Sequence, residues 1–403
     1  MRRSSEITPA VRTEHIKYAV RDIVVLAKKA EKRGKELLYL NIGDPNKFDF
    51  ATPDHIIDPI SGALRKNLNG YAPSSGIKPA LDAVEREAER KGIRNINDIF
   101  ITNGASEAIE LCLTALVNRG ENVLTPSPGY PLYTAIIARL EAVENPYYLD
   151  EADSWQPDIA DIEAKINSKT RAIVLINPNN PTGSNCSVQM LTELIAVAKK
   201  HDLIIFADEI YDKLLFDGDT HTSIAALDSD VPVITFAGLS KNYFGPGLRI
   251  GWGIVSGNGT RLTNYIEAIN KLLRARLCAN HPLQYGIAPA LKGSHDHIEA
   301  AIQKLTRRRD MTVEMLNDIE GISCVKPSGA FYAFPRLNDD WDDYKFVTGL
   351  IEETGVVTVP GSGFGQYPGT SHFRIVYLPQ DEILEKAYRE IGRFTKMFAD
   401  RNS

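Results

Sequence analysis

The sequence predicts an α/β fold in which helices cover both faces of a mostly parallel sheet. Two observations support this prediction: short runs of β-branched and other apolar residues recur through the middle of the chain, and longer amphipathic stretches separate them. Strands that are apolar on both faces are typical of sheets buried between two helix layers. The expected strands are residues 99–102, 122–124, 172–176, 203–207 and 233–236.

The helices expected between these strands include residues 106–117 and 188–200, where apolar residues recur about every third or fourth position. Ligands of parallel sheets bind beyond the carboxyl ends of the strands. We therefore expect the functional residues directly after each apolar run.

Composition and charge limit the class of protein. The chain has 403 residues, of which 43% are apolar and 24% are charged, as in ordinary globular proteins of two or three domains. Its 46 basic and 52 acidic residues give a net charge of −6, which argues against nucleic-acid or anionic-membrane partners. The four cysteines have no CxxC spacing, so we expect neither a disulfide framework nor a metal site.

The N-terminal sequence MRRSSEITPAV has no apolar stretch after its two arginines, so a signal peptide is not expected. The uninterrupted apolar runs are far shorter than the roughly 20 residues that a membrane helix needs. The sequence therefore predicts a cytoplasmic protein.

Small residues open the helix after the first expected strand. Gly104, Ala105 and Ser106 would leave free N–H groups at the positive end of the helix dipole, which suits a phosphate group. The same stretch also fits an ordinary helix cap by Asn103 or Ser106.

An Asn-Pro-rich segment, residues 177–183, follows the third run. It fits a tight turn, or a turn in which the buried amide of Asn180 donates to a ligand oxygen. The bond from Asn180 to Pro181 is a candidate cis peptide bond.

Asp208 follows the fourth run, and a charged carboxylate at the end of a buried strand needs a cation. Magnesium is one candidate, although no GxxxxGK[ST] loop precedes Asp208. A protonated pyridine nitrogen is the other candidate.

Lys241 and Arg249 follow the last run. Desolvation at the end of a buried strand can lower the pKa of a lysine and make its amine nucleophilic. Arg249 comes after a Pro-Gly turn and is suited to bind a phosphate in a bidentate way. An isolated lysine of this kind is more often a solvated surface side chain, but four such loops on successive strands favour a binding site.

Together these loops resemble those of the class I and II aminotransferases, which are fold-type-I pyridoxal-phosphate (PLP) enzymes. The resemblance extends from the Asn-Ile-Gly-Asp-Pro string at residues 41–45 to the His-Phe-Arg-Ile string at 372–375. Its most specific motif is Ser-Lys at 240–241 followed by Pro-Gly-Leu-Arg-Ile-Gly at 246–251. The sequence is most similar to bacterial and archaeal alanine aminotransferases, at residues 177–183, 206–213 and 276–280.

The resemblance implies that PLP is the cofactor. Lys241 would hold PLP covalently and then act as the base that moves a proton. Asp208 would keep the ring nitrogen protonated, which makes the ring an electron sink. Tyr211 and Asn180 would bind the phenolate oxygen of the ring, and Tyr130 would stack on the ring.

The resemblance also places the phosphate of PLP on the N–H groups of residues 104–106, with Arg249 as its charge partner. Many relatives carry a serine three residues before the lysine, where this chain has Gly238. Ser240 is the candidate substitute for that serine.

Tyr71 matches a tyrosine that crosses a dimer interface to the phosphate of the neighbouring site. The resemblance therefore implies a homodimer with shared active sites. Arg374 would bind the α-carboxylate of the substrate, with help from Asn180 and from the backbone at Gly43.

The predicted substrates are an amino acid and a 2-oxo acid, namely L-alanine and 2-oxoglutarate, with pyruvate and L-glutamate as products. Tyr18 and Arg21 are three residues apart and would share a helix face. In the resembling enzymes this segment lies over the substrate mouth, so Tyr18 would limit the side-chain pocket and Arg21 would bind the distal carboxylate of glutamate. Alternatively, Arg21 is solvated and Tyr18 is a core contact, and Arg276 is a rival candidate for the distal carboxylate.

The resemblance implies a large PLP-binding domain at residues 47–300 with a mostly parallel, seven-stranded sheet between helices. A smaller α/β domain would combine the N-terminal segment 1–46 with residues 301–403. We expect it to contain a strand at 38–41, and a long helix at 297–316 to lead into it.

Alternative functions share the same PLP shell. Aspartate, branched-chain and aromatic aminotransferases differ only in the substrate side chain, whereas carbon–sulfur lyases and 1-aminocyclopropane-carboxylate-forming enzymes divert the carbanion. A non-enzymatic, regulatory relative is disfavoured because the catalytic positions match and no DNA-binding segment is appended.

Overall fold

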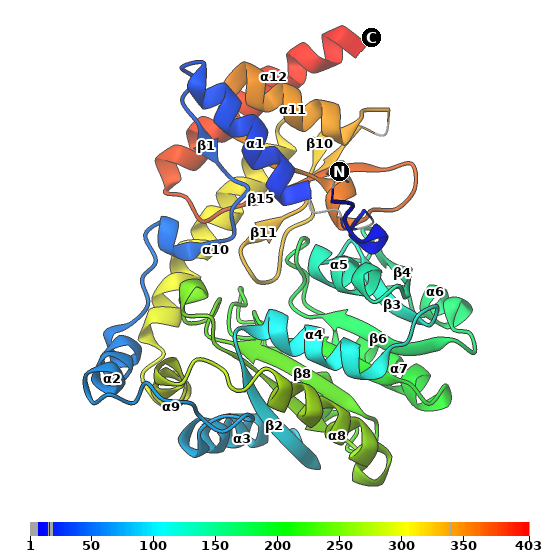
Figure 1. Ribbon diagram of the computed structural model, residues 1–403. Helices are drawn as coiled ribbons and strands as arrows, with labels where there is room; N and C mark the ends of the chain where they lie inside the picture. Colours follow the sequence, from blue (N-terminus) through cyan, green and yellow to red (C-terminus); the bar gives the residue numbers. More distant parts are fainter. Residues whose placement is uncertain (1–6, 15, 17–18, 339, 403) are drawn as a thin grey trace, which may run out of the picture.

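The computed structural model describes residues 7–14, 16, 19–338 and 340–402, and its largest sheet is a mixed, eight-stranded one with helices on both faces (Figure 1). In spatial order the strands are β2 (Ile96–Thr102), β9 (Gly251–Ser256), β8 (Val233–Gly238), β7 (Ile204–Asp208), β6 (Thr170–Ile176), β3 (Asn122–Ser127), β4 (Val143–Asp150) and β5 (Gln156–Pro157). The strands from β8 to β4 are parallel. β9 is antiparallel to both of its neighbours, and β5 is antiparallel to β4.

The α/β class and all five expected strands are confirmed. The number of seven strands was wrong, because β5 adds an eighth at the edge of the sheet. This strand is the dipeptide Gln-Pro, which is too short to show any alternation of apolar residues. It is a strand only because the longer β4 lies beside it.

Each face of the sheet has its own apolar core, since successive residues of a strand point to opposite faces. In β6, Ala172 and Val174 belong to one core, and Ile173 and Leu175 belong to the other. The helices over the first face are α4 (Ala105–Leu116), α5 (Pro131–Arg139) and α8 (Gly259–Ala275). Those over the second are α3 (Lys78–Arg90), α6 (Ile159–Lys165), α7 (Val188–Lys200) and α9 (Ile287–Lys292), with α2 (Asp54–Arg65) packed on α9. The two helices expected at 106–117 and 188–200 are confirmed as α4 and α7.

Segments from both ends of the chain come together beside the main sheet (Figure 1). β1 (Leu38–Tyr39) pairs in parallel with β13 (Val356–Val357). A second small sheet has the order β10 (Ile322–Ser323), β12 (Arg336–Leu337), β15 (Ser371–Val376), β11 (Tyr332–Ala333), and β14 (Val359–Pro360) also pairs with β15. The helices here are α1 (Ala19–Lys32), α10 (Asp296–Asn317), α11 (Asp343–Thr354) and α12 (Asp381–Asn402). The expected strand near residue 38 and the long helix are confirmed, whereas the three domain limits stay predictions.

Short 3-10 helices join these elements in the described part of the chain. They are η1 (Val11–Thr13), η2 (Pro45–Lys47), η3 (Ile224–Ala226), η4 (Pro246–Leu248), η5 (Pro282–Gly286) and η6 (Gly361–Phe364). The expectation of a cis bond before Pro181 was wrong: the cis bonds precede Pro128 and Pro178. None of the helices among the described residues is long and apolar enough to cross a membrane.

Candidate active site

A cavity of about 260 Å³ lies where the main sheet meets the segments from the two chain ends. Residues at the carboxyl ends of β6, β7 and β8 line it, together with the starts of α4 and α5. The expected site residues that line it are Gly43, Ala105, Ser106, Tyr130, Asn180, Asp208, Tyr211, Ser240, Lys241, Arg249 and Arg374. Loops that are far apart in the sequence therefore meet in one place, as the parallel sheet predicts.

The amine of Lys241 lies inside this cavity. Its Nζ donates a hydrogen bond to the carbonyl oxygen of Gly43 at 2.9 Å. The ring centroids of Tyr211 and Phe331 lie 6.0 Å and 5.6 Å from Nζ. Because this hydrogen bond goes to a neutral carbonyl rather than to a carboxylate, the amine can leave it for a reacting group without leaving that oxygen as an unpaired charge.

Asp208 is the last residue of β7 and only 4% exposed. Burial raises the pKa of its carboxyl to about 6, although hydrogen bonds from Ile210 and Tyr133 and the charge of Lys241 partly offset the effect. The two hydrogen bonds are long, both 3.4 Å. A cationic group in the cavity would stabilise the charged form of Asp208.

Tyr211 shares a hydrogen bond with Tyr332, a residue that the sequence did not mark. The two hydroxyl oxygens are 2.9 Å apart and both side chains are buried. Burial, and next the neighbouring Tyr332, hold the pKa of Tyr211 well above its ordinary value, so its hydroxyl is a proton donor at neutral pH. Tyr332 begins β11 and lies in the aromatic-rich stretch of residues 331–334. A tyrosine in such a stretch is typical of a core strand, and no motif marks it.

Arg374 of β15 is buried at 4% exposure and faces the cavity. Its Nη2 donates to the carbonyl oxygen of Asn41 at 2.7 Å, and its Nη1 donates to Oδ1 of Asn180 at 3.2 Å. The ring centroids of Tyr332 and Phe364 lie 4.8 Å and 4.6 Å from the guanidinium carbon. Two aromatic rings and two oxygens thus orient a cation that can bind a carboxylate.

The start of α4 and Arg249 form a second cationic end of the cavity. Gly104 precedes the helix with a φ of 85°, and Arg249 itself has a φ of 51°. A β-carbon on Gly104 would collide with the Arg249 guanidinium, so glycine is needed for the arginine to reach the helix start. Helix N–H groups beside a guanidinium form a site for a dianion such as phosphate.

The close packing at Gly238 explains why this chain departs from the pattern of its relatives there. A β-carbon on Gly238 would lie 2.6 Å from the Ile250 carbonyl oxygen and 3.0 Å from the Gly251 Cα. This backbone therefore has no room for a serine, whereas Ser240 lines the cavity and is 8% exposed.

Of the expected site residues that the structure describes in full, two do not line the cavity. Gly104 lies just behind it, and Tyr71 is 83% exposed on the surface. Tyr18 lies outside the described residues, and of Arg21 only the backbone, in α1, is described. The rival candidate Arg276 donates to the Ile101 carbonyl oxygen at 2.6 Å and does not line the cavity.

Comparison with known proteins decides the family. The family model for aminotransferase class I and II matches residues 35–391, which include every segment that lines the cavity. The chain belongs to this family. The expected resemblance to class I and II aminotransferases is thus confirmed.

Several relatives of this aminotransferase are similar over almost their full length. It is 41% identical to the glutamate-pyruvate aminotransferase AlaA of Escherichia coli strain K12, over 97% of this chain and 98% of that protein. Identity to the alanine aminotransferase of Mycobacterium tuberculosis strain H37Rv is 42%, over 91% of this chain and 87% of that protein. A solved alanine aminotransferase from Pyrococcus furiosus superposes with a TM-score of 0.93 at 39% identity, covering 97% of this chain and 100% of that chain.

Class I and II aminotransferases use PLP, and the residues in the cavity of this aminotransferase fit that group. Asp208 is a buried carboxyl whose charged form a cation would stabilise, and a protonated ring nitrogen is such a cation. The α4 start and Arg249 suit the phosphate, and the Lys241 amine faces the same cavity. Tyr211 and Asn180 also line the cavity and can donate to a ring oxygen.

Proposed function

We propose that this aminotransferase binds PLP and transfers the amino group of L-alanine to 2-oxoglutarate, giving pyruvate and L-glutamate. The observation that carries the proposal is the meeting of Lys241, Asp208 and Arg374 in one cavity. These residues supply an amine nucleophile, a carboxylate for a cationic ring and a guanidinium for the substrate carboxylate. The chain is 41% and 42% identical to enzymes named for glutamate-pyruvate and alanine transamination, over more than nine tenths of its length. This similarity supports the substrate pair.

On the cofactor side, Nζ of Lys241 would hold PLP covalently and the Asp208 carboxylate would keep the ring nitrogen protonated. Bound in this way, PLP withdraws electrons from the substrate and makes its Cα proton acidic. Tyr211 and Asn180 would donate to the ring oxygen, and Tyr130 would stack on the ring. Because Oδ1 of Asn180 accepts from Arg374, its Nδ2 group remains to donate.

The N–H groups at residues 104–106, Arg249 and Ser240 hold the phosphate in this proposal. Arg374 binds the α-carboxylate of the substrate, assisted by Asn180 and by the backbone at Gly43. The Lys241 amine would be the base that takes the Cα proton of the substrate. It leaves its hydrogen bond to Gly43 to do so, and the aromatic rings around Nζ limit the access of water.

The proposal further includes a homodimer in which Tyr71 serves the site of the second copy, and a cytoplasmic location. It divides the chain into a segment 1–46, a large domain 47–300 and a small domain 301–403. Tyr18 limits the substrate side chain to about the size of a methyl group, and Arg21 binds the distal carboxylate of glutamate.

The decisive experiment measures kcat/KM for alanine, aspartate, valine and phenylalanine with 2-oxoglutarate. We expect alanine to rank first, and Lys241→Ala to lose nearly all turnover and the visible absorbance of lysine-bound PLP. Arg21→Ala should lower kcat/KM for glutamate about tenfold or more while changing that for alanine little, because a charge-assisted contact is lost for only one substrate. Release of ammonia and pyruvate without a 2-oxo acid acceptor would indicate a lyase and overturn the proposal.

A further inference from the structure

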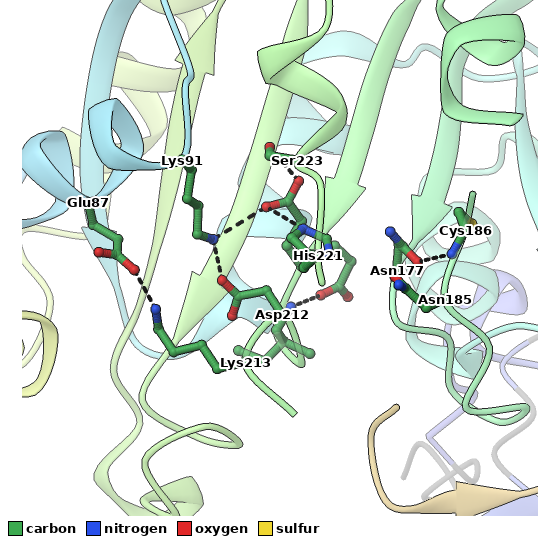
Figure 2. A network of polar contacts seen from close by, with 12 residues as sticks. Glu87, Lys91, Asn177, Asn185, Cys186, Asp212, Lys213, His221 and Ser223 are labelled. Carbon is green, nitrogen blue, oxygen red and sulfur yellow. Dashed lines mark hydrogen bonds and ion pairs between the residues drawn. The ribbon is translucent and has the colours of Figure 1, made fainter. Parts of the chain in front are cut away.

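A buried cluster of charges lies directly behind the segment that follows β7 (Figure 2). The ammonium of Lys91 forms ion pairs with Glu209, at 3.4 Å, and with Asp212. The side chains of Glu209 and Asp212 are 2% and 4% exposed, and that of Lys91 is 18% exposed. Lys91 is the C-cap of α3, so the cluster lies on the α3 face of the sheet, opposite the α4 and α5 face on which Asp208 contacts Tyr133.

This lysine contacts two residues of a segment that carries three cavity residues, Asp208, Ile210 and Tyr211. Asp208 and Tyr211 line the cavity, whereas the acidic residues next to them, Glu209 and Asp212, point to Lys91. The Lys91 ammonium therefore binds the five-residue segment 208–212 on the side that faces away from the cavity. Rotation of that segment would pull a carboxylate away from Lys91 inside the protein, where water cannot replace the contact.

The same cluster reaches the turn that carries Lys241. Nδ2 of Asn242, the next residue, donates to Oδ1 of Asp212 at 2.5 Å. The main-chain N–H of Glu209 also donates to the carbonyl oxygen of Phe236 in β8, at 2.9 Å. Glu209 and Asp212, the two ion-pair partners of Lys91, thus link the segment that contains Asp208 to β8 and to the turn that contains Lys241.

Neighbouring groups hold the carboxylates in their charged form. The Ser223 hydroxyl donates to Glu209 at 2.6 Å, and Nε2 of His221 lies 3.2 Å from Glu209. At the outer side, Lys213 pairs with Glu87 at 2.6 Å, as Figure 2 shows. Burial alone would raise the pKa of Asp212, but Lys91 and then Lys213 outweigh it and lower the pKa to about 2.

Such a cluster is costly to bury, and apolar side chains of similar size are often as stabilising as a buried ion pair. A role in positioning accounts for it better than stability alone. We infer that Lys91 is a positioning residue that holds segment 208–212 and the turn 240–242 in register across the cavity, an inference that rests on the proposed function for its catalytic meaning. Lys91 touches neither substrate nor cofactor in this account.

The first test uses the PLP-free chain and amide hydrogen exchange. We expect Lys91→Met to speed exchange about tenfold or more in peptides covering 208–213 and 239–244, because these segments lose their common anchor. Exchange in α12 should stay unchanged. The control Lys199→Met removes an exposed lysine, paired with Asp228 at 2.8 Å, and should alter neither segment. Uniformly faster exchange, or no change in the two segments, would refute the positioning role.

The second test asks whether the cluster acts on Lys241. Lys91→Met leaves two buried carboxylates unbalanced, and their negative potential favours the protonated form of nearby groups. The pH midpoint of the visible absorbance change of lysine-bound PLP should therefore rise by about one unit, a tenfold gain in proton affinity. The double variant Lys91→Met/Glu209→Gln restores the charge balance and should return the midpoint towards the wild-type value. An unchanged midpoint in a folded Lys91→Met enzyme would contradict the inference.

The two tests also separate this inference from the proposed function. Wild-type protein without visible absorbance after PLP is added would count against the cofactor, whereas the exchange result in the PLP-free chain would still decide whether Lys91 anchors both segments. If Lys91→Met does not fold, the double variant provides the exchange measurement, because it carries one unpaired carboxylate fewer. Wild-type exchange in both segments of the double variant would then overturn the inference.

Discussion

At Asp208, the charge of one carboxyl depends on what occupies the cavity in front of it. Burial raises its pKa to about 6 from an ordinary value of 3.8. The folded, PLP-free chain therefore binds this proton more tightly than the unfolded chain does. As the pH rises from about 4 to about 6, the folded state must give up the proton, and its free energy of unfolding falls. A protonated ring nitrogen beside Asp208 has the opposite effect, because the ionised carboxylate gains a partner.

We expect the Asp208→Asn variant of the PLP-free chain to exceed the wild type in free energy of unfolding above pH 6, by about 3 kcal/mol, and to equal it near pH 4. Urea unfolding followed by circular dichroism across this range measures the difference. Added PLP should remove the advantage, since only the wild-type carboxylate pairs with the ring. The exposed control Asp153→Asn should differ by less than about 0.5 kcal/mol at every pH. A pH-independent difference for Asp208→Asn would show that the Asp208 carboxyl does not titrate in this range.

The residue scale also shows what the sequence could and could not predict. Lys241 and Asp208 could be named because their chemistry is unusual after an apolar run, and Arg374 could be named only through the family resemblance. Tyr332 could not, because a tyrosine in an aromatic stretch is ordinary in a core strand, and its contact with Tyr211 arises only when distant strands meet. The absence of a serine at residue 238 was visible in the sequence, but its cause, the approach of the β9 backbone, was not.

Among the elements, α10 contacts both an N-terminal and a C-terminal part of the chain through one buried arginine. Arg308 on this helix is 2% exposed. Its Nη1 and Nη2 donate to the Asp49 carboxylate, both at 2.9 Å, and its Nε donates to Asp381 at 3.0 Å. Burial acts to raise the pKa of Asp49, but Arg308 and Lys304 lower it to about 2. The arginine thus joins α10 to the segment before α2 and to the start of α12.

We expect Arg308→Met to lower the free energy of unfolding by about 3 kcal/mol at pH 7, because the buried guanidinium is lost and two partly buried carboxylates each lose one of their two cationic partners. The neighbouring Arg307 also binds Asp381, at 2.7 Å, but its side chain is 66% exposed. Arg307→Met should therefore cost less than about 1 kcal/mol. Below about pH 4 the penalty of Arg308→Met should shrink as the carboxylates protonate. Urea unfolding of both variants provides the comparison, and equal losses would contradict it.

The lengths of the elements decide which of them the sequence reveals. β6 and α7 are long enough to show an apolar run or a helical period, and both were predicted close to their observed limits. β5 and β10 to β14 have two residues each, which is too short for any pattern. Such strands depend on partners elsewhere in the chain: β13, for example, pairs with β1 near the opposite terminus.

For the whole molecule, Tyr71 is the feature that a single chain does not explain. It is 83% exposed, yet its neighbours are anchored: the Ala72 N–H lies 3.4 Å from Sγ of Cys278, and the Gly70 carbonyl oxygen lies 2.8 Å from Nδ1 of His281. A large side chain on a fixed segment is suited to reach a second copy of the chain. The proposed homodimer gives Tyr71 a phosphate to bind there.

We expect Tyr71→Phe to weaken PLP retention, and mixing it with Lys241→Ala to restore one normal site per hybrid dimer. In such a hybrid, one site receives an intact Lys241 from its own chain and an intact Tyr71 from the other, while the second site has both defects. Chains carrying different affinity tags are refolded together, the hybrids are isolated, and PLP dissociation is measured. Hybrids that lose PLP as fast as Tyr71→Phe homodimers would rule out a shared site.

The arrangement of the whole molecule was predictable where local patterns act through the sheet. Four loops after successive strands were expected to meet, and they do, because parallel strands share one carboxyl edge. The position of Arg374 against Asn41 and Asn180 depends on how the two chain ends fold back over that edge. No local pattern encodes that arrangement, and only the family resemblance made it an expectation.

Lys241 and Arg374 both donate hydrogen bonds to carbonyl oxygens of one short stretch, residues 41–44. The Asn41 carbonyl oxygen accepts from Arg374, and the Gly43 carbonyl oxygen accepts from Lys241. A carbonyl oxygen is the same whichever side chain accompanies it, so replacements that keep the path of residues 41–44 leave both contacts in place. Gly43 differs, because a β-carbon there would collide with the hydroxyl of Tyr332. A saturation scan of the stretch would record size limits at Gly43 and at Asn41, whose side chain is fully buried. An engineering effort guided by that scan would overlook the two atoms that aim the amine and the guanidinium.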